Sequence, residues 1–126
     1  MALASTDQRL GARGLIAIGG LFADVSKLAI PSEILMRDGP LNSDEWRLMR
    51  QHTLRSSEVI HRSGIVIPSA LRATISHHAR ADASGYPDML RGDDIPIEAR
   101  YVAIADIFSA MTVDRAFQAR VDPLMR

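Results

Sequence analysis

Three things are missing from this sequence: cysteine, net charge and any long apolar run. Without cysteine the chain has neither a disulfide framework nor a thiolate zinc site, and its composition fits a reducing compartment. No apolar run approaches the roughly 20 residues that span a bilayer. The apolar stretch from Gly14 to Phe22 lacks the cleavage pattern of a signal peptide. We therefore expect a cytoplasmic protein without a membrane span.

The balance of charge argues against one class of partner. The chain has 15 basic and 15 acidic residues, and its pI is about 6.9. The arginines are scattered rather than gathered in a stripe, so a surface for a nucleic-acid polymer is not expected. A length of 126 residues with 47% hydrophobic residues suits one domain with one modest core. We expect a single domain over residues 1–126, in which residues 1–6 form a frayed start.

Glycine, proline and the apolar spacing divide the chain into helical segments. Asn42 is a good N-cap with Glu45 as its capping-box partner, and Pro68 suits the first turn of a helix that places Leu71, Ile75 and His78 on one face. Nothing has the alternation of a strand, so the fold should be all-α. The predicted helices cover residues 7–23, 31–36, 43–62, a segment from 68 onward, and 98–112.

A long polar loop is expected from Arg80 to Glu98, because this stretch contains glycine, proline and aspartate and shows no helical period. Loops of this length in compact domains are usually functional or disordered. The loop contains Gly85, Tyr86 and Pro87, which suit a tight turn. Tyr86 either contacts a substrate or anchors the loop by burying its ring, and the sequence leaves both alternatives open.

Four side chains suited to a divalent metal fall on faces expected to point inward: His52, His77, His78 and Asp106. The adjacent pair His77 and His78 is weak evidence alone, because neighbouring helix residues point about 100° apart. For His52 taken alone, a satisfied core histidine is the more common explanation, and His61 should face solvent. Asp106 lies among alanines, where a buried carboxylate needs either a cation or an arginine partner; the two remain equally open.

Several segments of the chain, in their order along the sequence, resemble the HD-GYP domain. This domain is a bacterial branch of the HD superfamily of metal-dependent phosphohydrolases. The resemblance runs from about Leu15 to Arg120. The matching stretches are Ala23-Asp24-Val25-Ser26-Lys27 with Ile30-Pro31, Leu41 to Trp46 with His52, His77-His78, Gly85-Tyr86-Pro87, Val102 to Asp106, and Ala110 to Arg115.

The resemblance implies an HD-type helical bundle that hydrolyses cyclic di-GMP to pGpG or GMP at a centre of two or three metals, often iron or manganese. It implies that Asp24 bridges the metals and that Lys27 faces the phosphate, and both would be catalytic. The implied metal ligands are Asp24, His52, His77, His78 and Asp106. The implied substrate or partner loop comprises Gly85, Tyr86 and Pro87, together with Arg115.

The chain departs from the family pattern at three positions in or beside the motifs of the metal site. Ala23 replaces the histidine of the His-Asp pair, Ala79 replaces the glutamate after the two histidines, and Ser26 replaces the glycine before the lysine. The family's further upstream histidine has no counterpart before His52, so we expect its helix to lie outside this chain. One metal position then keeps Asp24 and three histidines, whereas the other keeps only Asp24 and Asp106.

Three functions follow from these observations. The favoured one is a degenerate domain, weak or inactive as a phosphodiesterase, with one metal or none, that binds cyclic di-GMP or a signalling protein. In this family the Gly-Tyr-Pro loop has been linked to contacts with GGDEF-type diguanylate cyclases. The second is an active phosphodiesterase whose missing ligands come from water, Asp106 or an absent upstream region. The third is a different phosphohydrolase or a purely structural helical module.

Overall fold

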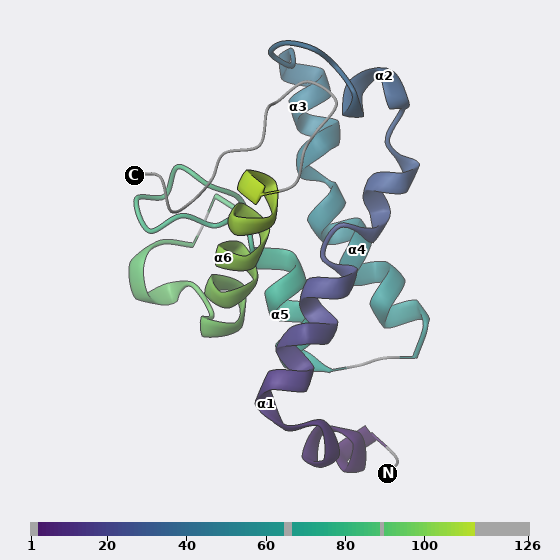
Figure 1. Cartoon of the computed structure of the whole chain (residues 1–126), viewed down its shortest axis with the longest axis vertical. Coiled ribbons are helices and arrows are strands. Elements are labelled where there is room, and N and C mark those ends of the chain that lie inside the picture. The colour runs from purple at the N-terminus through teal and green to yellow at the C-terminus, as the bar shows by residue number, and fades with distance from the viewer. Residues whose placement is uncertain (1–2, 65–66, 89, 113–126) are drawn as a thin grey trace.

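The computed structural model describes residues 3–64, 67–88 and 90–112, and every regular element within these ranges is a helix (Figure 1). The prediction of an all-α fold is therefore confirmed. No helix in these ranges is long and apolar enough to span a bilayer. In chain order the elements are α1 (Leu3–Phe22), the 3-10 helix η1 (Val25–Ala29), α2 (Ser32–Leu35), α3 (Ser43–Arg50), α4 (His52–Arg62), α5 (Pro68–Ser76), the 3-10 helix η2 (Gly92–Asp94) and α6 (Ile97–Thr112).

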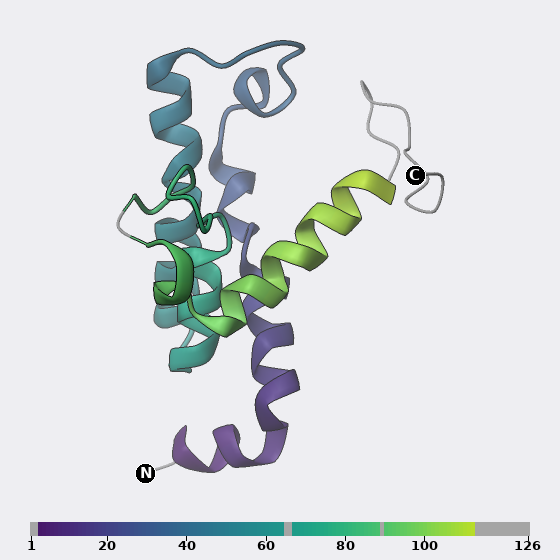
Figure 2. The same cartoon turned by 90° about the vertical axis from the view of Figure 1, so that its left-hand side faces the viewer.

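Helix α5 lies at the centre of the bundle, where it contacts α1, α4 and α6 (Figure 1). The short helix η1 packs on α4. Figure 2 shows α6 running obliquely across the other helices, so that its C-terminal end extends away from them. This arrangement brings the start of η1, the start of α4 and the end of α5 together on one side of the bundle.

Small residues allow the helices to approach closely. Ala70 and Ala73 of α5 are fully buried, and a Cβ atom added at Gly19 of α1 would lie 2.8 Å from the Cβ of Ala73. The hydroxyl of Thr74 donates a hydrogen bond to the Gly19 carbonyl at 3.2 Å. The buried positions of this helix are Ala70, Ala73, Thr74 and Ser76. Leu71 and Ile75 of the predicted apolar face are half-buried, and His78 lies beyond the last residue of the helix, Ser76.

The predicted single helix over residues 43–62 is interrupted at Gln51. There the Gln51 N–H donates to the Leu48 carbonyl three residues earlier, at 3.3 Å, which tightens the chain into a 3-10 turn. The adjacent Met49 carbonyl is in contact with the ring of His52 at 2.7 Å. A side chain thus competes for a carbonyl that an uninterrupted helix would use internally.

The local signals are confirmed. The Asn42 side chain accepts hydrogen bonds from the backbone of Asp44 and Glu45, and the Glu45 carboxylate accepts one from the Asn42 N–H, which completes the capping box. Other helix boundaries differ from prediction by a few residues, as helix ends commonly do. The described part of the Arg80–Glu98 segment contains only the short η2 before α6 begins at Ile97. Helix α1 contains a kink at Gly11, whose φ of 61° lies in the left-handed region.

Candidate metal centre

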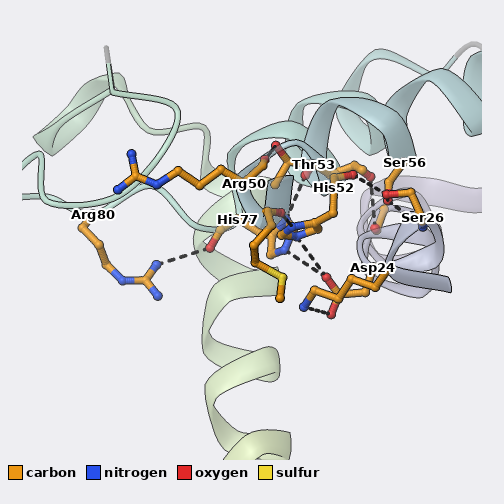
Figure 3. A network of polar contacts seen from close by, with 12 residues as sticks. Asp24, Ser26, Arg50, His52, Thr53, Ser56, His77 and Arg80 are labelled. Atoms are coloured by element: carbon orange, nitrogen blue, oxygen red, sulfur yellow. Dashed lines mark hydrogen bonds and ion pairs between the residues drawn. The ribbon is translucent and has the colours of Figure 1, made fainter. Parts of the chain in front are cut away.

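Four side chains from three parts of the chain bring their donor atoms together in one place, and Figure 3 shows three of them, Asp24, His52 and His77. Asp24 immediately precedes η1, His52 begins α4, and the two remaining histidines follow α5. One ligand atom from each lies within 4.8 Å of all the others. The Oδ1 atom of Asp24 is 3.2 Å from Nε2 of His52 and 3.6 Å from Nε2 of His77. The four residues are Asp24, His52, His77 and His78, hereafter the Asp-His cluster.

Backbone carbonyls fix the tautomers of two of these histidines. Nδ1 of His52 lies 2.7 Å from the Met49 carbonyl, and Nδ1 of His77 lies 2.8 Å from the Thr74 carbonyl. A carbonyl oxygen only accepts, so Nδ1 carries the proton in both rings. The Nε2 atoms then face the centre of the cluster, as in metal sites where the backbone holds Nδ1 and Nε2 binds the ion.

The donor set fits a divalent metal ion. Oδ1 of Asp24 and the Nε2 atoms of all three histidines are buried and have no hydrogen-bond partner among the described residues. Buried polar atoms are nearly always satisfied, so four such atoms aimed at one point require an explanation. Three imidazoles and one carboxylate suit iron, manganese, zinc or nickel, and a bound cation would satisfy all four atoms together.

The charges in the cluster also suit metal binding. Burial by itself raises the pKa of Asp24, but the contacts with His52, His77 and Lys27 outweigh burial and hold that pKa well below its usual range. Burial lowers the pKa of His78 to about 3, and the charges of His77, His52 and Lys27 add to the effect. At neutral pH the cluster therefore offers an ionised carboxylate and a neutral His78 imidazole, the forms that bind metals.

Lys27 shares the carboxylate of Asp24 with the histidines. Its Nζ lies 2.8 Å from Oδ2 of Asp24, on the oxygen that the histidines do not approach. The two residues are three positions apart, so the ion pair is local to η1. The ammonium therefore lies at the edge of the cluster.

The Gly-Tyr-Pro loop packs directly on the cluster. The Tyr86 N–H donates to the His78 carbonyl at 3.2 Å. The Tyr86 ring stacks on the His78 ring with centroids 4.8 Å apart and an interplanar angle of 25°. A Cβ atom at Gly85 would lie 2.1 Å from the same carbonyl, so only glycine fits there. Burial, followed by the charge of Asp24, raises the pKa of Tyr86 to about 12, and its hydroxyl remains a proton donor.

Asp106 is not part of the cluster, although it lines a cavity that the cluster also borders. A cavity of about 400 Å³ is lined by Asp24 and Asp106. Ala23 lines the same cavity. Asp106 is half-buried rather than enclosed by alanines, and it forms no ion pair with another described residue. Ala23 is 4% exposed and packs with Ala73 and Val102. Its methyl group occupies the histidine position without offering a donor.

Two further predictions concern His61 and Arg115. His61 is exposed, as expected, and Arg115 lies outside the described residues. Sequence reasoning missed two contributors. Ser56 contacts Ser26 from 30 residues away, a separation that carries no local signal. Arg50 lies over the Tyr86 ring, and its spacing of four residues from Trp46 was the available signal.

Comparisons with known proteins identify the family of this chain. The HD domain family model matches residues 5–123. The chain is 42% identical over 96 residues to 3'3'-cGAMP-specific phosphodiesterase 2 of Vibrio cholerae, which covers 75% of this chain and 18% of that protein. It is 37% identical over 105 residues to the cyclic di-GMP phosphodiesterase response regulator RpfG of Xanthomonas campestris pv. campestris, covering 82% of this chain and 28% of the relative.

A third relative, the cyclic di-GMP phosphodiesterase of Thermotoga maritima, is 36% identical over 96 residues, which covers 75% of this chain and 26% of the relative. The chain therefore belongs to the HD domain family, in its HD-GYP branch. The chain spans between 18% and 28% of the length of these three relatives.

Proposed function

We propose that this chain is a degenerate HD-GYP domain of bacterial cyclic di-GMP signalling, weak or inactive as a phosphodiesterase, which acts by binding. One observation carries the proposal. Four donor atoms gather into a single site, whereas the neighbouring Ala23 is buried without a donor where the family has a histidine. We keep the cytoplasmic location expected from the sequence as part of this proposal.

A divalent metal, iron or manganese by family resemblance, would be held by the Asp-His cluster, where it would supply positive charge for a phosphate and a more acidic bound water. The chain's own residues prepare the same place for an anion. Lys27 presents an ammonium beside Asp24, and Tyr86 keeps its proton and can donate a hydrogen bond.

Two-metal hydrolysis clamps the attacking and the leaving oxygen between two ions. A second ion would have Asp24 and Asp106 as its donors from this chain, and Ala23 adds none. Two carboxylates with no imidazole are few protein donors for a transition metal. The expected consequence is binding of a phosphodiester without efficient cleavage.

The orientation of the Gly-Tyr-Pro loop favours a nucleotide over a protein as the bound species. Gly85, Tyr86 and Pro87 are all half-buried, and Tyr86 is stacked on a histidine of the cluster rather than projecting outward. The names of the relatives give cyclic di-GMP and 3'3'-cGAMP as their substrates. A GGDEF-type cyclase is the alternative partner, and it would have to use the outer rim of this loop.

An active cyclic di-GMP phosphodiesterase is the second candidate, with donors completed by water or by residues outside this sequence. The observation that favours it is the cavity of about 400 Å³ between Asp24 and Asp106. This cavity has room for a further ligand on the side of the vacant histidine position.

Elemental analysis of protein purified without chelator, combined with a cyclic di-GMP turnover assay on the same sample, tests the proposal. We expect one divalent metal per chain or none, and turnover far below the roughly 1 s⁻¹ at the lower end of typical enzymes. Two or more metals with turnover near 1 s⁻¹ would establish the active enzyme instead. Saturable binding of cyclic di-GMP without turnover is the outcome that the proposal requires.

A further inference from the structure

One surface next to the Asp-His cluster has a composition that neither the metal centre nor the helix packing explains. Arg50 of α3 places its guanidinium carbon 5.4 Å from the centre of the Tyr86 ring and 5.9 Å from the centre of the Trp46 ring. Arg47 lies one turn away on the same helix. We call this surface, formed by Trp46, Arg47, Arg50 and Tyr86, the α3 shelf.

The α3 shelf is hollowed and open. A cavity of about 280 Å³ lies between α3, the start of α4 and the Gly-Tyr-Pro loop, and a second of about 380 Å³ lies along Trp46. Arg47 and Arg50 border both cavities, so the two lie next to each other. Small-molecule sites are commonly clefts of about 300–1,000 Å³.

The shelf continues directly from the metal centre. The Tyr86 ring stacks on His78 of the cluster and is also a neighbour of the Arg50 guanidinium. In Figure 3, Asp24 lies on one side of the histidines and Arg50 extends toward the other side. A ligand whose phosphate lies at the cluster would therefore pass over Tyr86 to reach Arg50.

The donors of Arg50 are available. Its only ion-pair partner among the described residues is Asp88, at 3.6 Å, and both side chains are substantially exposed. Such a pair contributes little and is easily displaced. Trp46 is 46% exposed, which leaves part of its indole uncovered. A planar guanidinium pairs bidentately with phosphate, and an exposed indole stacks on nucleobases.

We propose that the α3 shelf is a nucleotide subsite, in which Arg50 holds a phosphate and Trp46 stacks on the base of the half of a cyclic dinucleotide that lies away from the Asp-His cluster. This inference rests on the proposed function. It assigns a binding role to α3 and makes Arg50 and Trp46 determinants of affinity for a dinucleotide.

The chain contains a single tryptophan, Trp46, which makes the shelf directly observable. Calorimetry of the manganese-loaded chain with cyclic di-GMP gives the affinity, and tryptophan fluorescence in the same titration reports on the shelf. We expect the fluorescence to change saturably with the same dissociation constant as the heat.

Four variants sharpen the test. Arg50→Gln should weaken cyclic di-GMP binding about tenfold or more, because a hydrogen bond to a charged group is lost. Trp46→Ala should weaken cyclic di-GMP binding by a similar factor. Trp46→Phe keeps an aromatic ring and should retain most of the parent's affinity. Asp88→Asn should instead tighten binding about twofold to fivefold, because it frees Arg50.

Arg62→Gln is the matched control, because it removes the same charge at the exposed far end of α4. It should leave the affinity unchanged, and all variants should keep the parent's metal content. Binding with silent tryptophan fluorescence and unchanged affinity in Arg50→Gln and Trp46→Ala would overturn the subsite while leaving the proposed function intact. No binding by the parent chain would overturn both.

Discussion

The hydroxyl of Ser56 donates a hydrogen bond to the hydroxyl of Ser26 at 3.0 Å, which joins α4 to η1 in the interior. Ser26 in turn donates to the His52 carbonyl at 2.7 Å, and its own N–H donates to the Ser56 oxygen at 3.1 Å. Ser26 is the residue that replaces the family glycine. The two serines thus hold Asp24, two residues from Ser26, beside His52.

Replacing Ser56 with alanine should destabilise the fold by about 1–3 kcal/mol, because it leaves the buried Ser26 N–H without its acceptor. The metal content should fall as well, because the Ser26–Ser56 contacts no longer hold Asp24 beside His52. Urea unfolding followed by circular dichroism measures the first effect and elemental analysis the second. Ser57→Ala is the control, because that neighbouring hydroxyl bonds only the exposed Leu54 carbonyl. Equal losses in the two variants would contradict the role given to Ser56.

Replacing Ala23 with histidine should add a second equivalent of metal. The side chain at position 23 borders the cavity that also contains Asp24 and Asp106, so an imidazole there would join two carboxylates. Elemental analysis and cyclic di-GMP turnover measure the gain. Ala23→Leu, of similar bulk but without a donor, should leave the stoichiometry at the parent value. Unchanged stoichiometry in the histidine variant would mean that further donors are needed.

Gly85→Ala should displace the Gly-Tyr-Pro loop from the cluster, because the new Cβ would lie 2.1 Å from the His78 carbonyl and 2.7 Å from the Arg80 nitrogen. Overpacking of this kind typically costs about 1–3 kcal/mol. We expect weaker cyclic di-GMP binding by calorimetry together with a lower unfolding free energy. The adjacent Ser84→Ala, on an exposed side chain, should change stability by less than about 0.5 kcal/mol. If Gly85→Ala kept the parent's cyclic di-GMP affinity and unfolding free energy, the contact of this loop with the cluster would matter for neither binding nor stability.

Two neighbouring glycines of α1 should respond to alanine with opposite signs. At Gly19 the added Cβ would lie 2.8 Å from Ala73 and 3.0 Å from the Ala70 carbonyl, so Gly19→Ala should destabilise the protein by about 1–3 kcal/mol. At Gly20 the nearest atom belongs to Val102, at an ordinary 3.6 Å. Gly20→Ala should therefore stabilise by up to about 1 kcal/mol through helix propensity. Thermal melts of the two variants give the comparison, and the same sign in both would contradict the close α1–α5 packing.

Stability should fall with acid partly through Glu98. The Glu98 carboxylate accepts a hydrogen bond from Arg72 at 2.6 Å and joins α6 to α5. Burial raises the pKa of Glu98, but the bond from Arg72 outweighs it and leaves the pKa below its usual value. A lowered folded pKa gives stability that is present above the unfolded pKa of about 4.3 and is lost as the pH falls through the folded value.

Glu98→Gln should therefore flatten the dependence of unfolding free energy on pH between about pH 5 and pH 3, by no more than about 1 kcal/mol. Urea titrations at several pH values measure the slope. The exposed Glu58→Gln on α4 should keep the slope of the parent protein. Parallel slopes for the parent chain and Glu98→Gln would show that the ion pair adds nothing.

The sequence by itself determined the features that depend on neighbours along the chain. The capping box at Asn42 depends on Glu45, three positions along the chain, so the sequence alone predicted it. The proline that opens α5 and the absence of strands in the described residues follow from the same local rules. The sequence also predicted membership of the HD-GYP branch, because the motifs of that branch occur in the same order along this chain.

Tertiary structure decided how the candidate ligands meet. His77 and His78 would point about 100° apart on a helix, but α5 ends at Ser76, and both follow in the turn with their ring centroids 4.1 Å apart. Likewise, Asp106 lies on α6, which crosses the other helices obliquely (Figure 2), and its carboxylate is not among the donor atoms of the cluster. The bond between Ser26 and Ser56 spans 30 residues. Such contacts depend on how helices pack, and packing is set by the whole bundle rather than by any single segment.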